Sequence, residues 1–544
     1  MRWRWLWVPL FIWGLLSSPA RADNRVIVRT TLGLQGLEAF CNGGLPLLQT
    51  CTVVGGLDGP LGQLFLVTTP VDLTTFLNLL SGTVGIVDAE ADQLLSLVGG
   101  LNQVTTPPAG LQDTAPVSYS GSTVWDGYVN QPAASIVRVA AAQTTFNVTG
   151  TGIVADIDTG VDPNHPALQP VLLPGYDFTR NQPGGSEMTD YSGPPPSGGN
   201  GSVFQVNQST AAVLEQSTAA VLEGSPYAAF GHGTIVLGII HLVSPQAQLL
   251  PLKAFSSDGT GFLSNILHAV YYGVQSGTNV INMSFEMKVN SLEFSKSMDY
   301  ANQNGVICAA SAGNDGMQVI VYPASYQNNV MGVASTSDTD TRSSFSNYGD
   351  AIVWVAAPGE AIISTYPFST YAAGWGTSFS APFVSGAGAL LLNLDSTTNQ
   401  SKAAAAVANA VPLSDPGMGN GRLDLVQALQ SVTPPSGSPA DFGISLSPTG
   451  NTINAGQSAV FTISVTPTGS FNKAVMFSCS GLPTGASCNV APSTVTLDGT
   501  NASTAHLVVR NGPPGATPAG TYPIVVTGTS ANVSHATTAQ LTVN

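Results

Sequence analysis

Short apolar runs rich in β-branched residues alternate with helical patterns between about residues 124 and 432. Six of these runs are predicted strands: 153–157, 248–254, 280–283, 306–310, 330–334 and 352–356. Strands that are apolar throughout are typical of a parallel sheet buried on both faces. The pattern therefore predicts an α/β domain whose parallel sheet carries helices on both sides.

Polar residues follow directly on three of these predicted strands. Asp158 follows the run 153–157. Asn282 and Ser284 lie at the end of the run 280–283, and Asn314 comes shortly after 306–310. Functional loops of such sheets lie outside the carboxyl ends of the strands. We therefore expect these side chains to belong to one functional site.

Residues 376–382, with the sequence GTSFSAP, form a predicted turn that opens a helix of small apolar residues. At a helix N-terminus, Ser378 would face free backbone N–H groups and the positive end of the helix dipole, which favour a developing anion. Such a place suits a nucleophile. The same residues also fit an ordinary N-capping sequence, so this stretch alone leaves both interpretations open.

Two further stretches favour the catalytic interpretation. Asp158 ends an apolar strand and precedes a tight Thr-Gly turn, and His232 stands between two glycines before the apolar run 235–240. An acid, a histidine and a serine in this chain order form one of the known arrangements of the serine-protease triad.

Four motifs in order resemble the subtilase family of subtilisin-like serine peptidases: DTGVD at 158–162, HGT at 232–234, SAGN at 311–314 and GTSFSAP at 376–382. The resemblance implies a serine endopeptidase that cleaves protein or peptide substrates through an acyl-enzyme. It implies Ser378 as the nucleophile, His232 as the general base and Asp158 as its orienting partner. Asn314 is implied as a donor of the oxyanion hole.

The resemblance also implies the substrate contacts. Residues Gly259, Thr260 and Gly261 match an edge segment that pairs with substrate as an added strand. The walls of the primary specificity pocket are implied at Ser284, Phe285, Ser311, Ala312 and Gly313. Glu286 stands close to where the family commonly has glycine, so that Phe285 and Glu286 could narrow the pocket or favour a basic substrate side chain.

Other positions depart from the family pattern. Asp156 is acidic at a usually apolar position, and Leu237 replaces a small residue after the HGT motif. Ala167 stands where many subtilases place an acidic calcium ligand. No cofactor is expected for catalysis and no metal ligand is predicted, while structural calcium elsewhere stays open because its ligands include scattered backbone carbonyls.

Charge and the N-terminus indicate an exported protein. The 544 residues carry 15 Lys and Arg against 31 Asp and Glu, a net charge of −16, which argues against a nucleic-acid partner. In residues 1–22, two arginines precede an apolar run from Leu6 to Leu16, and an A-x-A cleavage pattern follows it, as in a secretory signal peptide. We expect an extracellular or periplasmic protein with no membrane span after signal cleavage; an uncleaved anchor is the alternative.

The remaining chain divides into further predicted segments. Residues 23–102 alternate strand and helix patterns and resemble the inhibitor-type propeptide of subtilases, which would make the chain's own propeptide an intramolecular inhibitor; a permanent N-terminal domain is the alternative. Residues 103–123 are a predicted linker and maturation region, and 124–432 are the subtilisin-like peptidase domain. Within it, an exact tandem repeat, QSTAAVLE at 208–215 and 216–223, is interpreted as an inserted surface loop.

After a Pro/Ser/Gly linker at 433–439, about seven short alternating strands in 440–544 predict an immunoglobulin-like β-sandwich acting as spacer or weak binding module. The cysteines form two close sequence pairs, Cys41 with Cys51 and Cys479 with Cys488, which are predicted disulfides. Cys308 lies in an apolar run and is expected to be a buried core residue.

Two other functions compete with an active protease. A subtilase fold without activity could serve as a binding or surface protein, and the residues around Glu286 are the feature that favours it. The full set Asp158, His232, Asn314 and Ser378 argues against this, because a binding protein does not need all four. A sedolisin-type acid peptidase would have a glutamate in place of His232.

Overall fold

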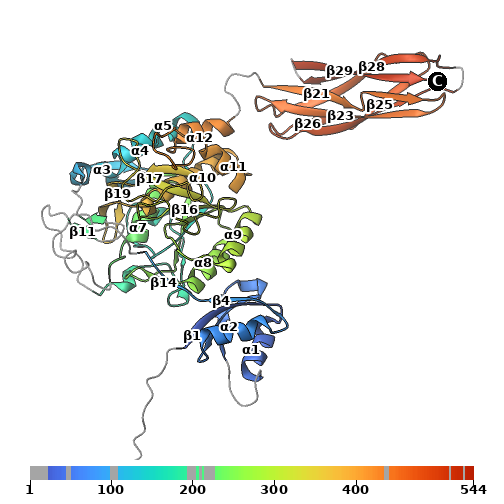
Figure 1. Cartoon of the computed structure of the whole chain (residues 1–544). Coiled ribbons are helices and arrows are strands. Elements are labelled where there is room, and N and C mark those ends of the chain that lie inside the picture. Colours follow the sequence, from blue (N-terminus) through green and yellow to red (C-terminus); the bar gives the residue numbers. More distant parts are fainter. Residues whose placement is uncertain are drawn as a thin grey trace, which may run out of the picture. The chain divides into compact units, whose positions relative to one another are not determined.

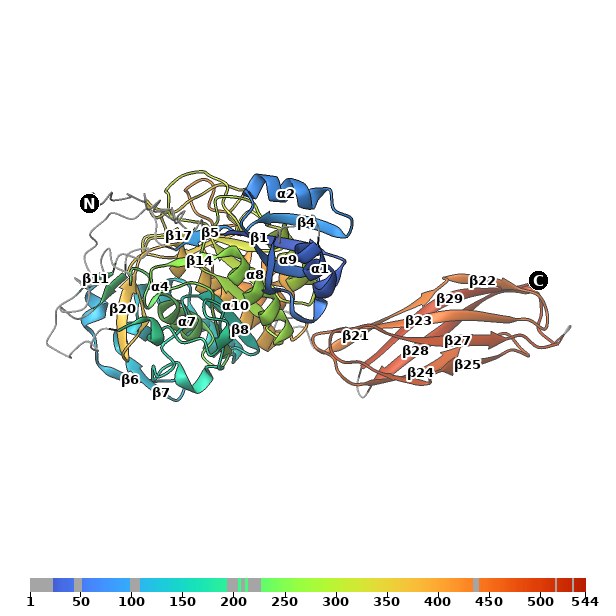
Figure 2. The same cartoon turned by 90° about the horizontal axis from the view of Figure 1, so that it is seen from below.

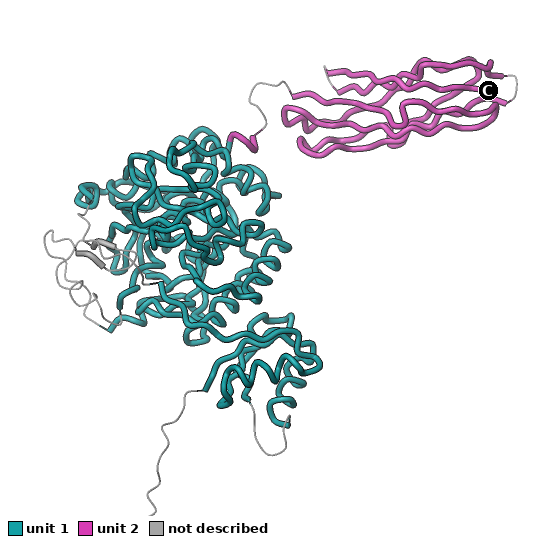
Figure 3. Tube along the Cα trace, in the orientation of Figure 1, with its two compact units in different colours: residues 1–429 teal, residues 430–544 magenta. Residues whose placement is uncertain are grey.

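The computed structural model describes residues 23–43, 51–97, 108–192, 204–206, 211–213, 227–433, 440–513, 516–530 and 533–544. The chain forms two compact units, residues 1–429 and 430–544 (Figure 3). The predicted signal peptide 1–22, the linker positions 434–439 and most of the tandem repeat lie outside the described residues.

A small α+β module opens the first unit. Its antiparallel sheet has the order β2-β3-β1-β4, built from β1 (Asn24–Thr30), β2 (Thr52–Gly56), β3 (Leu64–Thr69) and β4 (Ile86–Ala91). Its helices are α1 (Gly33–Gly43) and α2 (Leu73–Ser81), which alternate with the strands as the pattern of residues 23–102 predicts. A Cys41–Cys51 disulfide links α1 to the residue before β2.

The two faces of this small sheet pack in different directions. Val26 and Val28 of β1 join the module's own core with residues of α1 and α2. Ile27, between them, joins the large apolar cluster that includes α8 (Leu263–Gln275) and α9 (Leu292–Gln303). Because side chains alternate along a strand, one sheet face carries the module's helices and the other faces α8 and α9 (Figures 1 and 2).

A larger sheet forms the centre of the first unit and has the order β10-β9-β13-β8-β15-β16-β17-β18. All its neighbouring strands are parallel except β9 and β10. Its strands are β8 (Ile153–Asp158), β9 (Tyr176–Asp177), β10 (Gln182–Pro183), β13 (Gln248–Lys253), β15 (Val280–Met283), β16 (Ile307–Ser311), β17 (Met331–Thr336) and β18 (Val355–Pro358). The six predicted strands are all present, each displaced by at most three residues at its start.

Helices cover both faces of this sheet, as predicted. On one face α7 (His232–Val243) packs against α10 (Ala381–Leu394), and on the other α8 packs against α9 (Figure 1). Both α7 and α10 are almost entirely buried, which explains why their sequences are apolar all round instead of amphipathic.

Shorter elements surround this core. They are η1 (Gly59–Leu61), α3 (Asp126–Val129), α4 (Pro132–Ile136), α5 (Val139–Phe146), η3 (Gln169–Val171), η4 (Met188–Asp190), α11 (Gln400–Val407) and α12 (Leu425–Val432). A second sheet has the order β11-β12-β20-β19, with β11 (Phe204–Val206), β12 (Ala211–Val213), β19 (Ile362–Tyr366) and β20 (Thr370–Gly374). Strand β12 falls in the first copy of the tandem repeat and pairs with β20.

The predicted linker 103–123 differs from what the structure shows in its second half. Residues 108–123 include η2 (Ala109–Gln112), strand β6 (Pro116–Tyr119) and the start of β7 (Ser122–Trp125). Leu111 is fully buried, and Gly127 fits so closely against Gly110 that a Cβ there would lie 1.9 Å from the Gly110 oxygen. Residues 108–123 therefore form short regular elements, part of which pack closely on the domain.

The second unit contains two sheets around one apolar core. The sheets have the orders β21-β23-β27-β25 and β22-β29-β28-β24-β26. The strands are β21 (Asp441–Ser447), β22 (Gly450–Ile453), β23 (Ser458–Thr468), β24 (Ala474–Ser480), β25 (Ser487–Ala491), β26 (Thr494–Thr496), β27 (Ser503–Arg510), β28 (Gly520–Ser530) and β29 (Val533–Val543). The described residues thus hold nine strands where about seven were predicted, and a Cys479–Cys488 disulfide joins β24 to β25.

Candidate active site

Three elements of the first unit bring the predicted triad residues into one region. Asp158 is the last residue of β8, and His232 is the first residue of α7. Ser378 lies in a short 3₁₀ turn, η5 (Thr377–Phe379), directly before α10. Helices α7 and α10 pack together on the sheet face that includes β8. The end of β8 and the starts of the two helices therefore meet beside the carboxyl ends of the strands.

Asp158 and His232 form a buried hydrogen-bonded pair. The Nδ1 atom of His232 lies 2.8 Å from each carboxylate oxygen of Asp158. Both residues are 1% exposed, and the Thr159 N–H also donates to Asp158 at 2.6 Å. A carboxylate in this place fixes the ring so that Nδ1 carries a proton and Nε2 is the basic nitrogen.

The Nε2 atom of His232 is buried and has no hydrogen-bond partner among the described residues. Ser378 Oγ donates to the backbone oxygen of Ser284 at 3.1 Å instead of to the histidine. The His232 ring packs on Phe379, the residue after Ser378, with ring centroids 5.5 Å apart. In this structure the Ser378 hydroxyl is therefore hydrogen-bonded to the residue that follows β15 and not to the imidazole.

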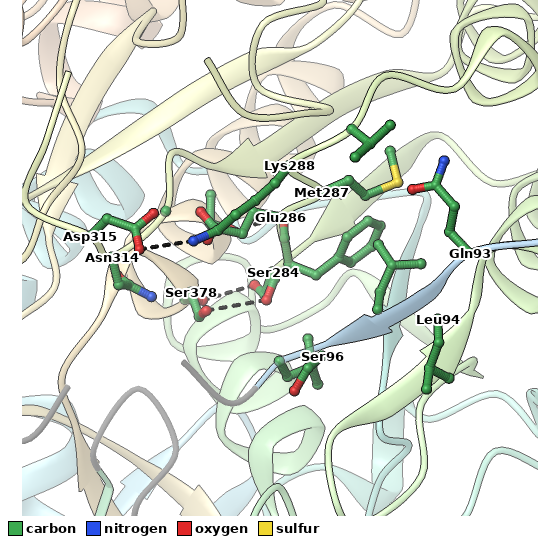
Figure 4. Close-up of a pocket in the computed structure, with 16 residues that line it drawn as sticks. Gln93, Leu94, Ser96, Ser284, Glu286, Met287, Lys288, Asn314, Asp315 and Ser378 are labelled. Carbon is green, nitrogen blue, oxygen red and sulfur yellow. Dashed lines mark hydrogen bonds and ion pairs between the residues drawn. The ribbon is translucent and has the colours of Figure 1, made fainter. Parts of the chain in front are cut away.

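Asn314 is held by the turn that carries Ser378. Its Oδ1 accepts hydrogen bonds from the Thr377 N–H at 2.8 Å and from the Thr377 hydroxyl at 3.0 Å. The amide nitrogen is therefore on the other branch of the side chain, and Figure 4 shows it directed to the side of Ser378. A donor in this place can reach an oxygen that develops negative charge beside Ser378.

A pocket of roughly 360 Å³ opens beside Ser378 (Figure 4). One wall is the segment 284–289, the other is 311–315, and residues 93–97 of the N-terminal module line the rest. Of the predicted pocket residues, Ser284, Phe285, Ser311 and Gly313 line it, whereas Ala312 is fully buried in an apolar cluster behind the wall.

Phe285 contributes little to the pocket, because its side chain is 3% exposed and packs between Phe255 and Phe294. Glu286 instead reaches across to the opposite wall: a Cβ added to Gly313 would lie 1.7 Å from Glu286 Oε2. Burial and the nearby Asp315 charge raise the pKa of Glu286 to about 7, although Lys288 acts in the opposite direction. The pocket wall thus carries a carboxyl group that changes its charge near neutral pH.

The predicted substrate edge is paired with the chain's own N-terminal module. Strand β14 (Thr260–Phe262) is antiparallel to β5 (Leu94–Ser96), with Thr260 opposite Ser96. The Leu97 N–H continues the ladder by donating to the Gly259 oxygen at 2.8 Å. Gly261 cannot carry a side chain, since a Cβ would lie 2.6 Å from the Ala254 oxygen. The module therefore reaches toward Ser378 as an added strand.

Asp156 lies two residues before Asp158 on β8 and is also buried, at 1% exposure. It accepts a hydrogen bond from Asn282 Nδ2 at 2.9 Å, while its second oxygen has no partner among the described residues. Burial and the neighbouring Asp158 charge raise the pKa of Asp156 well above its usual range. Both acids lie on β8, but His232 is hydrogen-bonded to Asp158, whereas the partner of Asp156 is Asn282.

The sequence analysis missed one buried acid next to this pair. Glu187 is fully buried and contacts residues beside both Asp158 and His232. It lies in a loop with no apolar periodicity, so no pattern singles it out. Three other acids, Asp190, Glu215 and Glu223, lie between Glu187 and the histidine motif, so sequence position does not single it out either.

Among the residues that the structure describes, no group of three or more His, Cys, Asp and Glu side chains is arranged to hold a metal ion. Within the same residues, no helix has the length and apolar character needed to cross a membrane.

Comparisons with known proteins agree in pointing to one family. The family model described as the subtilase family, Peptidase_S8, matches residues 150–434. The chain is 32% identical to thermitase of Thermoactinomyces vulgaris over 49% of its own length and 84% of that protein. It is 33% identical to subtilisin BL of Lederbergia lenta over 47% of its length and 82% of that protein. A crystal structure of a cold adapted subtilisin-like serine proteinase is 26% identical, covers 51% of this chain and 90% of that chain, and has a TM-score of 0.41.

Proposed function

Because this chain belongs to the subtilase family of serine peptidases, we propose that Ser378, His232 and Asp158 are the triad with which it hydrolyses peptide bonds. The reaction class follows from the family: the chain is a serine endopeptidase. The observation that carries the residue assignment is the buried Asp158–His232 pair, whose unpartnered Nε2 lies at the turn of Ser378.

In the proposed reaction, Ser378 Oγ turns from the Ser284 oxygen to His232 Nε2 and attacks the substrate carbonyl carbon. His232 takes the hydroxyl proton and later gives it to the leaving amine, so that an acyl-enzyme forms. Asp158, with both oxygens 2.8 Å from Nδ1, stabilises the imidazolium that exists between these two steps. Water then releases the acyl group by the same proton transfers in reverse order.

The oxyanion of the tetrahedral intermediate is proposed to bind the Asn314 amide nitrogen and the Ser378 N–H. The support is that Thr377 holds the amide oxygen of Asn314 with two hydrogen bonds, so the donor needs no reorganisation during the reaction. The substrate chain is proposed to pair with Gly259, Thr260 and Gly261, in the place where β5 pairs in this structure.

The module 23–97 is proposed to be a propeptide that inhibits the peptidase until it is removed. Its strand β5 occupies the proposed substrate edge, and two of its acids bind the N-termini of α8 and α9. Asp92 accepts from the Ser264 N–H at 2.8 Å, and Glu90 accepts from the Leu292 N–H at 3.2 Å. Carboxylates at helix N-termini are favourable because they accept from free N–H groups. Cleavage within the predicted maturation region 103–123 would release the module.

Two further parts of the chain complete the proposal. Residues 1–22 are proposed to direct secretion as a signal peptide, which agrees with the export typical of the family. The two-sheet unit at 440–544 is proposed to be an immunoglobulin-like spacer or weak binding module. The rival function is an inactive subtilase fold whose working part is this C-terminal unit.

The test compares the secreted chain 23–544 with its Ser378→Ala variant in an oxidising compartment. The parent is expected to lose an N-terminal fragment of about 80 to 90 residues and to hydrolyse casein, while the variant does neither. If both proteins are folded yet neither is processed nor active, the inactive binding function replaces the protease.

A further inference from the structure

Glu187 is a fully buried acid that the proposed mechanism does not use. Its carboxylate accepts three hydrogen bonds: from the Gly231 N–H at 2.7 Å, from the Thr159 hydroxyl at 3.0 Å and from the Thr234 hydroxyl. The first two go to Oε2 and the third goes to Oε1, so both oxygens are bound.

The neighbouring backbone favours one direction for the two threonine hydrogen bonds. Thr159 Oγ1 accepts from the Gly233 N–H at 3.0 Å, and Thr234 Oγ1 accepts from the Asp162 N–H at 2.8 Å. Each hydroxyl therefore uses an acceptor site for the backbone, and its single hydrogen is directed to Glu187. In this arrangement all three hydrogen-bond partners of Glu187 donate to it, as suits an ionised carboxylate better than a neutral carboxylic acid.

The three donors flank the catalytic pair. Thr159 follows Asp158 in the chain, while Gly231 precedes His232 and Thr234 comes two residues after it. The two segments lie so close that a Cβ on Gly233 would be 2.1 Å from the Gly160 oxygen. Glu187 also binds the same loop through its backbone, donating its N–H to the Val161 oxygen at 3.0 Å.

We propose that Glu187 is a positioning residue that sets the Asp158–His232 geometry by fastening the chain on both sides of the pair, and that it does so as a carboxylate. This inference rests on the proposed function of Asp158 and His232. Glu187 does not act on the substrate; it fixes where the base stands relative to its orienting acid.

Charge makes this arrangement sensitive to pH. Burial raises the pKa of Glu187 to about 7, although its three hydrogen bonds and the Lys253 charge act in the opposite direction. The ionisable groups that surround the same loops are Asp156, Asp158, Asp190, His232, Lys253 and Tyr366. Below about pH 7, a protonated Glu187 carries a hydrogen toward groups that themselves donate to it. Its hydrogen bonds to Gly231, Thr159 and Thr234 should therefore weaken as the pH falls.

The test is the Glu187→Gln variant, which keeps the shape of the side chain and removes its charge. After processing, kcat/KM for a soluble peptide is measured from pH 5 to 9 for parent and variant. In the parent, log(kcat/KM) should fall on the acidic side with a slope approaching 2, because His232 and Glu187 both take up a proton. In the variant the slope should be 1, and kcat at pH 8 should be about 10- to 100-fold lower, with a smaller change in KM.

Asp424→Asn is the matched control, because Asp424 is another buried carboxylate of the first unit, bound by Arg138 and by the Gln427 N–H. It should lower the unfolding temperature and leave the slope at 2. A slope of 2 in Glu187→Gln, or equal changes in both variants, would overturn the proposal. An inactive but folded parent would instead refute the function on which it rests.

If Glu187→Gln does not fold, a second variant tests the proposal. Thr234→Val removes one donor and leaves the carboxylate, which should raise the pKa of Glu187 further. In the pH profile of kcat/KM, the transition assigned to Glu187 should therefore move to higher pH. An unmoved transition would contradict the role of Glu187 in the loss of activity at low pH.

Discussion

Ser284 and Ser378 bind each other through reciprocal hydrogen bonds. Ser378 Oγ donates to the Ser284 backbone oxygen at 3.1 Å, and Ser284 Oγ donates to the Ser378 backbone oxygen at 2.8 Å. Ser284 Oγ also accepts from Asn282 at 2.9 Å. The nucleophile turn is therefore tied to the end of β15 independently of His232.

Ser284→Ala should reduce turnover without abolishing it. The variant removes the hydrogen bond to the Ser378 oxygen, a buried contact worth about 1 kcal/mol, so kcat should fall about fivefold through looser placement of the turn. Steady-state kinetics on a peptide substrate provide the measurement. Ser297→Ala removes a comparable buried serine contact inside α9 and should leave kcat unchanged; an equal loss in both variants would contradict the role of Ser284.

Asn314→Ala should lower kcat by about 10²–10³-fold while KM changes little, because the oxyanion exists in the transition state and not in the bound substrate. Active-site titration with an acylating inhibitor would verify that Ser378 is still present in folded enzyme. If KM rose while kcat stayed constant, Asn314 would be a ground-state substrate contact instead.

The sequence predicted the parts of this protein that depend on local patterns. The six strands follow from continuous apolar runs, and Asp158, His232 and Ser378 stand in short motifs whose glycines mark turns. These features need no knowledge of which segments meet. The antiparallel partner of the predicted substrate edge, by contrast, depends on where residues 94–96 fold back, and no local pattern states this.

Tertiary packing decided the remaining features. Phe285 lines the pocket as predicted, but most of its surface is buried, because its ring packs on Phe255 and Phe294 from two other segments. The role proposed for Glu187 could not be predicted, because it depends on hydrogen-bond donors from two segments that are distant in the sequence. Helix α1 forms despite its glycines because Leu37 and Cys41 are buried against the small sheet.

Glu286 should favour substrates with a basic residue before the cleaved bond, and the preference should grow with pH. Its pKa of about 7 means that the carboxylate forms as pH rises from 6 to 8, so attraction to Lys or Arg increases over that interval. We expect kcat/KM for an arginine peptide relative to its alanine counterpart to rise about tenfold, or about 1.4 kcal/mol. Glu286→Gln should make this ratio independent of pH, and an unchanged ratio in the parent would rule out the electrostatic role.

Arg29→Ala should weaken inhibition by the N-terminal module. Arg29 donates to Glu293 Oε2 at 2.7 Å, and the Glu293 side chain is 0% exposed. Losing one partner of such a pair costs about 2 kcal/mol or more, so the cleaved but bound module should dissociate about thirtyfold more readily. The delay between N-terminal cleavage and the appearance of activity measures this. Lys402→Ala removes an ion pair with Asp395 that involves no residue of the N-terminal module, and it should preserve the delay.

Asp156→Asn should make the folded protein less sensitive to alkaline pH. The pKa of Asp156 is raised in the folded state, so above about pH 4 the unfolded chain releases a proton that the folded chain keeps. The folded state then binds more protons than the unfolded state, and the free energy of unfolding must fall as pH rises through this range. Asparagine keeps the shape and the hydrogen-bonding site for Asn282 but has no proton to release. Denaturant unfolding at pH 5 and pH 8, in a Ser378→Ala background that prevents self-digestion, should therefore show a smaller loss of stability for the variant. An equal loss with and without Asp156 would mean that its buried carboxyl group is already ionised at pH 5.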